Sequence, residues 1–509
     1  MRTSHGWMDR LLLCILFVCP TLAAGTQSPE PIDIGSRLEL FVDNTLIESL
    51  DGTRLILHHP RPTEVALKFD RPWEGAFCAY VTVLHDGDTY RMYYRGKPSA
   101  RPDGSLDEVT CYAESRDGIH WEKPDLGLVE VAGSRKNNVV LGPEYAPVPH
   151  NFIAFVDTRP GIPASERYKG LGGLFPISEE QRFSNGLMGF TSADGIRWRQ
   201  IKKEPLIDAS LQTFTDTTPS PTFWSAHEGQ YVCYVRTWKR DPSRPIPRKG
   251  WIGNVRWIGR TTSKDFLTWT PVQMMDPGDD PMEHIYTNQT SPYFRAPHIY
   301  LAVAARLMRG RQVVTEKQAK ELRVNPSYFE DCADAVLMSS RGGKRYQRTF
   351  LEAFIRPGIG LQNWTSRTNY PSLNLVPTGD HEISLYVQHE YGQPGHSLWR
   401  YTLRTDGFVS VRAPYRGGEF LTRLLRFSGL NLVLNFATSA PGGIRVEIQD
   451  PDGRPIDGYT LADCDEVIGN EIERAVTWKG KRDVGSLAGK PVRLRFVMKD
   501  ADLYSLRFP

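Results

Sequence analysis

Three carboxylates occupy corresponding places in the 509-residue sequence, each just before a stretch that is predicted to form a β-strand. They are Glu74, Asp216 and Glu283. A protonated carboxyl can give its proton to a leaving oxygen, while an ionised carboxylate attacks as a nucleophile or activates water. We therefore predict Glu283 as a general acid, Asp216 as the base or nucleophile, and Glu74 as a third carboxylate that orients the substrate or tunes the pKa of the acid. Structural ion pairs with nearby arginines are the alternative role for each.

Side chains suited to binding a hydroxyl-rich or anionic substrate accompany these carboxylates. Aromatic rings can stack on sugar rings, and guanidinium groups present a planar fork that suits sugar hydroxyls, uronate or sulfate. Core packing and structural ion pairs are the alternatives. The candidate binding residues are Trp73, His150, Asn151, Trp224, Arg236, His284, Tyr286, Asn288, Arg295, Arg367 and Asn369.

A repeat defines the elements that must position these residues. Ser115-Arg-Asp-Gly-Ile-His-Trp121 recurs at 192–198 and 263–269, with weaker copies at 340–346 and 404–410. The Asp-Gly pair favours a tight hairpin turn, and alternating apolar residues around it predict strands. Two further predicted strands precede each copy, so five units of about four strands predict an all-β, five-bladed propeller. The aspartates are expected to shape the turns, and the tryptophans to pack between blades.

The repeat ends near residue 415, but strand-like alternation continues, which predicts a C-terminal β-sandwich. The expected division is a signal peptide over 1–24, a strand-rich N-terminal segment over 25–66, a five-bladed β-propeller over 67–414 and a β-sandwich over 415–509. We expect the strand-like stretch 38–57 to pair with the last blade or with the sandwich. The innermost strands of a propeller line its channel, so residues before them should converge at one mouth.

The pattern S-x-D-G-x-x-W-x-x-P, as in Ser115 to Pro124, and the propeller–sandwich order resemble the five-bladed β-propeller glycoside hydrolases of the invertase-like family 32 and the arabinanase-like family 43. The stretches Glu283 to Tyr300 and Asp500 to Phe508 are similar to secreted bacterial members of this group. The resemblance implies hydrolysis of glycosidic bonds in a poly- or oligosaccharide. It implies no required cofactor, and it leaves a structural calcium in the channel open.

Two other functions fit the same residues. A non-catalytic carbohydrate-binding propeller would bind a glycan without changing it. A polysaccharide lyase would remove a proton with histidine or tyrosine and neutralise a uronate with arginine or a metal.

Composition and the N-terminus bear on partners and location. The 62 basic and 59 acidic residues leave a net charge of +3, so we expect no nucleic-acid partner. Arg2 and Arg10, followed by the apolar run from Leu11 to Val18, predict a secretory signal peptide and a secreted or periplasmic protein without a membrane span. The five cysteines beyond it include no C-x-x-C pair and are predicted to be buried free thiols. No metal-binding motif is recognised, and the oligomeric state stays open.

Overall fold

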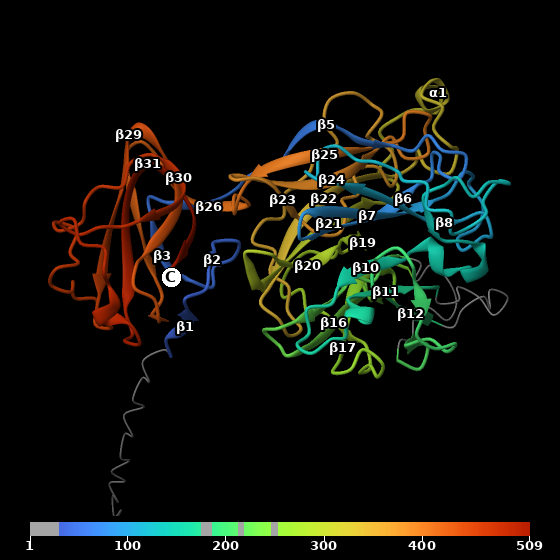
Figure 1. Ribbon diagram of the computed structural model, residues 1–509. Coiled ribbons are helices and arrows are strands. Elements are labelled where there is room, and N and C mark those ends of the chain that lie inside the picture. The colour runs from blue at the N-terminus through green and yellow to red at the C-terminus, as the bar shows by residue number, and fades with distance from the viewer. Residues whose placement is uncertain (1–29, 175–185, 212–217, 246–252) are drawn as a thin grey trace, which may run out of the picture.

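The computed structural model describes residues 30–174, 186–211, 218–245 and 253–509, and their fold is almost entirely β (Figure 1). The short helices are α1 (Glu316–Glu321), η1 (Pro143–Tyr145), η2 (Val148–His150), η3 (Ala164–Glu166) and η4 (Gly485–Leu487). Among the described residues, no helix has the length and hydrophobicity needed to span a membrane. The five described cysteines are buried thiols, as predicted, and none of them forms a disulfide.

Five small sheets form the blades of a propeller, which confirms the predicted fold. Blade one contains β6 (Ala79–Asp86), β7 (Thr89–Gly96), β8 (Val109–Ser115) and β9 (Val139–Leu141). Blade two contains β10 (Ile153–Val156), β11 (Tyr168–Gly172), β12 (Gly186–Ser192), β13 (Arg199–Gln200) and β14 (Ile207–Asp208). Blade three contains β15 (Thr222–Ser225), β16 (Gln230–Lys239), β17 (Val255–Ser263) and β18 (Gln273–Met274).

The last two blades vary this plan. Blade four contains β19 (His284–Thr287), β20 (Thr290–Tyr293), β21 (Ala296–Met308) and β22 (Cys332–Ser340), and both β19 and β20 pair with β21. Blade five contains β23 (Val376–Gly379), β24 (Glu382–His389), β25 (Ser397–Arg404) and, at its outer edge, β5 (Arg61–Lys68). An N-terminal strand therefore completes the last blade and closes the ring.

The predicted hairpin turns are present in blades one to three. The carboxylate of Asp117 accepts hydrogen bonds from two backbone N–H groups of its own turn at 2.8 Å, and Asp194 and Asp265 do the same. The ring of Trp198 in blade two lies 5.9 Å from that of Tyr93 in blade one. These residues are therefore structural, as the repeat predicted.

Removing one inter-blade tryptophan should destabilise the propeller. Trp198 is nearly fully buried, so Trp198→Ala is expected to lower the free energy of unfolding by about 3–5 kcal/mol. Denaturant unfolding followed by fluorescence measures this. Phe294→Ala is the control, because Phe294 is a large aromatic residue that is 41% exposed. Equal losses in the two variants would contradict the inter-blade role of Trp198.

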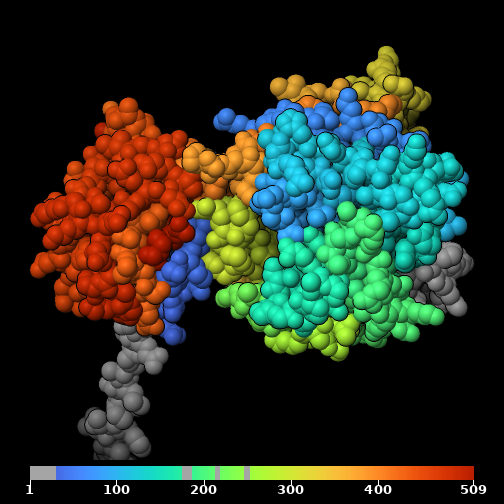
Figure 2. Space-filling model, viewed as in Figure 1, coloured from blue at the N-terminus to red at the C-terminus, as the bar shows by residue number. Residues whose placement is uncertain are grey.

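The C-terminal strands form a second, larger sheet beside the propeller (Figures 1 and 2). Its strands are β26 (Val409–Ala413), β27 (Gly418–Thr422), β29 (Val433–Gln449), β30 (Asn470–Ala475), β31 (Arg493–Arg507), β2 (Glu39–Leu40), β3 (Ile47–Asp51) and β4 (Arg54–Leu57). The register between β29 and β31 shifts between Thr438 and Gly443, a bulge of the kind that bends long strands. The sheet surrounds its own apolar core, where Phe420 stacks on Phe496, an arrangement compatible with the predicted sandwich.

The N-terminal segment contributes to both sheets. Strands β2, β3 and β4 join the C-terminal sheet, β1 (Ile32–Gly35) pairs with β28 (Leu425–Phe427), and β5 joins blade five. On these pairings we propose that the propeller comprises about residues 61–408, and that the segment before β5 belongs with the C-terminal unit.

Candidate active site

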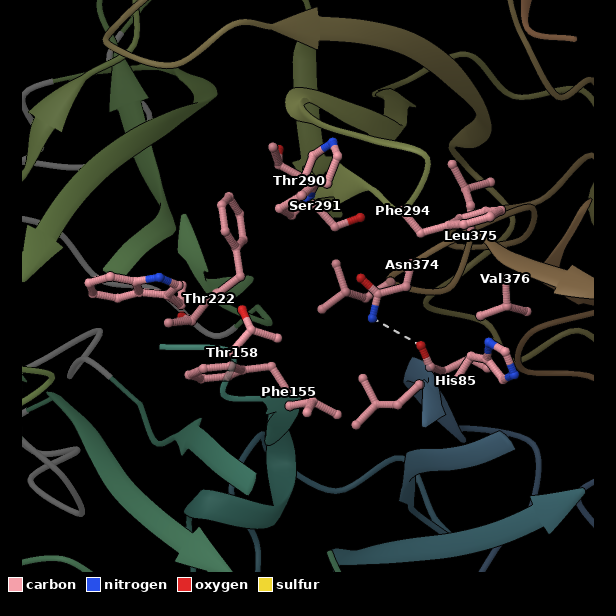
Figure 3. Close-up of a pocket in the computed structure, with 18 of the residues that line it drawn as sticks. His85, Phe155, Thr158, Thr222, Thr290, Ser291, Phe294, Asn374, Leu375 and Val376 are labelled. Carbon is pink, nitrogen blue, oxygen red and sulfur yellow. Dashed lines mark hydrogen bonds between the residues drawn. The ribbon is translucent and has the colours of Figure 1, made fainter. Parts of the chain in front are cut away.

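The inner strands run between two mouths of the channel. A pocket of 480 Å³ at one mouth is lined by residues from all five blades, including His85, Phe155, Thr222, Ser291 and Val376, and in blades one and two these lie near the end of the inner strand (Figure 3). Contacts join β6 to β10, β10 to β15, β15 to β20 and β23 to β6. The residues that precede β6, β10, β15 and β20 therefore lie toward the opposite mouth, where the sequence predicted a site.

The pocket at the strand ends is poorly equipped for acid–base chemistry. Of the described residues that line it, His85 alone has a titratable side chain, and the rest are mainly apolar or carry hydroxyl groups. Its polar group Asn374 donates from Nδ2 to the carbonyl of Val83 at 2.9 Å, the bond drawn in Figure 3. The candidate active site is therefore the other mouth.

A charged cluster joins blades one and two at that mouth. The loop between β7 and β8 brings Asp103 and Glu108 beside His150. His150 is the last residue of η2 and lies shortly before β10. Nδ1 of His150 lies 2.7 Å from a Glu108 oxygen, and Nε2 lies 3.7 Å from Asp103. Lys97 forms ion pairs with both carboxylates. The side chain of Asp103 is 35% exposed and that of Glu108 only 1%, so Asp103 is the carboxylate accessible to a substrate.

Both carboxylates are held in their ionised form. Burial acts to raise their pKa values, but the charges of His150, Lys97 and Arg95 outweigh it. The pKa of Glu108 falls to about 2, and that of Asp103 lies well below its ordinary value. At neutral pH these groups can therefore act as bases, nucleophiles or hydrogen-bond acceptors, but not as proton donors.

The same cluster has the composition of a metal site, because one ligand atom from each of Asp103, Glu108 and His150 lies within 4.8 Å of the others. Two cationic side chains already lie beside these ligand atoms. Lys97 Nζ lies 3.3 Å from Asp103, and Nη1 of Arg95 lies 3.3 Å from both ring nitrogens of His150. Two cationic side chains thus balance the two carboxylates. The cluster therefore does not fit a calcium ion.

Blades three, four and five contribute what we call the arginine–tyrosine cluster: Tyr286, Arg236, Arg256 and Arg367. Tyr286 lies in β19, and Arg236 and Arg256 lie in β16 and β17. The guanidinium carbons of Arg236, Arg256 and Arg367 lie 5.3, 5.3 and 5.6 Å from the centre of the Tyr286 ring, within cation–π distance. Three cationic groups therefore surround one phenol.

This arrangement changes the acidity of its members. Burial opposes ionisation of Tyr286, but Arg367, Arg236 and Arg256 outweigh it and hold the pKa of the phenol below its ordinary value. Burial, reinforced by the charge of Arg236, lowers the pKa of Arg256 to about 10. The cluster thus favours negative charge and disfavours further positive charge.

The two clusters form one site. Asp103 is among the charges that act on Tyr286, and Arg367 is among those that act on Asp103. Tyr80, at the start of the inner strand of blade one, bridges them, with its ring 5.6 Å from that of His150. With Arg236 of blade three included, side chains from all five blades converge at this mouth.

Three residues at this mouth have a strained backbone. Tyr80, Arg367 and Asn369 have φ angles of 60°, 61° and 68°, in the left-handed region that non-glycine residues rarely adopt. Each such residue costs about 1–3 kcal/mol and persists only where its surroundings impose it. Asn374, which lines the pocket at the opposite mouth, also has a positive φ angle of 73°, so the strain accompanies the candidate site without distinguishing it from the other mouth.

The structure places Glu74 and Glu283 in ion pairs. Glu74 is fully buried and accepts hydrogen bonds from Tyr94 Oη and Lys123 Nζ, both at 2.6 Å. Glu283 pairs with Arg306 at 3.0 Å and with Arg348 at 2.6 Å. These contacts match the alternative, structural role of both residues. Asp216 lies outside the described residues.

The predicted binding residues are divided between the site and the framework. Four of them lie in the site: His150, Tyr286, Arg236 and Arg367. His284 contacts the backbone of a site residue, because its Nδ1 accepts a hydrogen bond from the backbone N–H of Arg256 at 3.2 Å. Sequence reasoning did not single out Asp103, Glu108, Tyr80, Arg95 or Arg256. The available signal was the excess length of each unit over about 40–45 residues, which predicted long loops at a site.

The other predicted residues have framework roles. Trp73 donates from Nε1 to Asn138 at 2.9 Å, Trp224 lines the opposite mouth, and Arg295 pairs with Asp406 at 3.1 Å. The three predicted amides hold the backbone: they are Asn151, Asn288 and Asn369.

Comparison with known proteins gives distant matches. No protein-family model matches the chain. The uncharacterized proteins MT1551 and Rv1502 of Mycobacterium tuberculosis are 27% and 28% identical to it over 157 residues. That segment is 30% of this chain and 41% of each relative, so the match spans less than half of their length.

Structures of glycoside hydrolases are among those similar to this chain. A family 43 arabinoxylan arabinofuranohydrolase from Bacillus subtilis, in complex with cellotetraose, is 12% identical with a TM-score of 0.40, over 86% of this chain and 96% of that one. An N-acetylgalactosamine deacetylase from F. plautii, in complex with a blood group B trisaccharide, is 11% identical with a TM-score of 0.42, over 70% and 96%. A glycosyl hydrolase from Bacteroides ovatus is 14% identical with a TM-score of 0.34, over 72% and 93%.

Proposed function

We propose that this protein is a glycoside hydrolase-like enzyme that cleaves glycosidic bonds of a poly- or oligosaccharide at the mouth where the inner strands begin. The observation that carries the proposal is the convergence there of Asp103, His150, Arg236, Tyr286 and Arg367 from the five blades. Burying so many polar groups at one place is costly unless a ligand uses them. We also propose that the chain is exported, as its N-terminal sequence predicts.

Asp103 is the carboxylate that we propose for catalysis. It is ionised and partly exposed, and it is oriented by its ion pairs with Lys97 and His150. It therefore serves as nucleophile or base, while Glu108 positions His150 and Lys97 from behind. Hydrolysis also needs a protonated carboxyl that gives its proton to the leaving oxygen. The sequence predicted Glu283 for this role and Asp216 as base or nucleophile, but Glu283 is paired with Arg306 and Arg348, and Asp216 lies outside the described residues.

A second candidate function rests on Tyr286. A phenol with a lowered pKa next to arginines is suited to remove the acidic proton beside the carboxylate of a uronate. The electron pair would then form a carbon–carbon double bond, the bond to the leaving oxygen would break, and Tyr286 would return its proton to that oxygen. This β-elimination consumes no water.

Screening the purified protein on a glycan panel distinguishes these functions. Hydrolysis is expected to give saturated products with new reducing ends and incorporation of solvent oxygen. Elimination gives products that absorb in the ultraviolet as unsaturated uronates. Tight binding of a glycan without turnover would contradict both reactions and would establish a binding propeller.

A further inference from the structure

Two members of the arginine–tyrosine cluster, Arg256 and Arg367, lie beside Tyr286 without an ion pair to any carboxylate of the described residues. Arg256 forms no ion pair with any described carboxylate, and its Nε and Nη1 atoms are buried without a hydrogen-bond partner among the described residues. Its guanidinium lies between the rings of Trp238 and Tyr286, at 4.8 and 5.3 Å from their centres. Buried guanidinium atoms without an acceptor or an anionic partner destabilise a fold, so their retention calls for a ligand.

Arg367 faces the same phenol from the neighbouring blade. Nη1 of Arg367 donates to the hydroxyl of Tyr328 at 2.9 Å, a neutral partner that leaves its charge uncompensated at close range. The backbone of Arg367 is held in the left-handed region, which fixes the direction in which its side chain leaves the backbone. Two guanidinium groups on different blades thus approach one point at the channel mouth.

We propose that Arg256 and Arg367 bind an oxyanion carried by the substrate sugar, a carboxylate or a sulfate ester. This inference rests on the proposed function, because the oxyanion is part of the substrate at the same mouth. Planar guanidinium groups bind such oxyanions through paired, charge-assisted hydrogen bonds. The unused N–H donors of Arg256 would gain their acceptors on binding. Neutral glycans would leave these donors unpaired, which is a strong basis for rejecting them.

Calorimetry with simple probes tests the proposal on the full chain. The probes are galacturonate for a carboxylate, galactose 6-sulfate for a sulfate ester, galactose as the neutral analogue and inorganic sulfate as the free ion. At least one anionic sugar is expected to bind more tightly than galactose. Arg256→Gln should weaken that binding roughly ten- to a hundredfold, because a charged hydrogen bond is lost.

Arg260→Gln is the matched control. Arg260 lies on the same strand, β17, but pairs with Glu228 away from the cluster, so its loss removes the same charge without touching the site. Its affinity for the anionic sugar should equal that of the wild type. Thermal unfolding without ligand adds a second readout: Arg256→Gln should unfold at or above the wild-type temperature, whereas a structural arginine would unfold below it.

Each outcome supports or overturns the inference. Equal binding of galactose and the anionic sugars, unchanged binding by Arg256→Gln, or binding of inorganic sulfate alone overturns it. Binding of an anionic sugar that depends on Arg256, without cleavage of any glycan, supports the oxyanion site and counts against the proposed enzyme. Cleavage of neutral glycans only would support the enzyme and overturn the oxyanion site.

Discussion

Asp103→Asn is expected to lower kcat on an identified substrate by roughly 10²–10⁴-fold, because it removes the ionised carboxylate that faces the channel mouth. Steady-state kinetics on the glycan selected by the panel measures the effect. The pKa of Asp103 lies below its ordinary value of 3.8, so the carboxylate stays ionised as the pH falls toward that value. The acidic limb of the wild-type profile that reports this group should therefore lie below pH 3.8.

Asp107→Asn is the control for this prediction. Asp107 lies in the same loop and accepts a hydrogen bond from Ser99 at 2.7 Å. The substitution therefore removes a carboxylate of the same loop that belongs to neither cluster of the candidate site. It should leave kcat within a few-fold of the wild type. If Asp103→Asn does the same while Tyr286→Phe abolishes turnover, hydrolysis through Asp103 is wrong and elimination by the phenol is favoured.

Asp406→Ala is expected to lower the free energy of unfolding by about 3–5 kcal/mol, because it leaves buried donors without their acceptor. Asp406 is fully buried in the turn between β25 and β26. It accepts hydrogen bonds from Tyr293 and Arg295 of blade four at 2.7 and 3.1 Å. It also accepts bonds from Asn435 and Ser505 of the C-terminal sheet at 3.1 and 2.8 Å.

One carboxylate thus joins the propeller to the C-terminal sheet. Urea unfolding measures the loss, and Asp452→Ala is the control, since the Asp452 side chain is 66% exposed. A loss below about 1 kcal/mol, the range of surface substitutions, would show that the contact between the two units does not depend on this hub.

The prediction of the fold succeeded because its signals are local. Asp117 and its counterparts bond the backbone N–H groups of their own turns, so a short motif specifies a hairpin wherever it occurs. The alternation of apolar residues around the motif specifies strands, and five spaced copies specify five blades. The closing strand β5 carries no such motif, and its place at the edge of blade five follows only from its pairing with β25.

The candidate site was predicted in part. His150, Tyr286 and Arg367 are shared by the prediction and the candidate site because they precede the inner strands, whereas Arg236 was predicted as an oxyanion-binding residue and lies in β16, the second strand of blade three. Glu283 occupies an equivalent position in sequence, but Arg306 and Arg348 lie close enough to bind it. Whether a carboxylate can bind a substrate depends on its distance from arginines on other strands. The sequence does not contain that distance.

The sequence by itself determined the all-β class and the five units, because these follow from turn chemistry, alternation and repetition. Only the tertiary structure decided that Asp103 lies with His150, and that Arg256 lies against Tyr286. These partners come from different blades and are far apart along the chain. Their contacts exist because the closed ring brings separate loops to one axis, and the electrostatic energy of a pair depends on separation in space rather than on spacing along the chain.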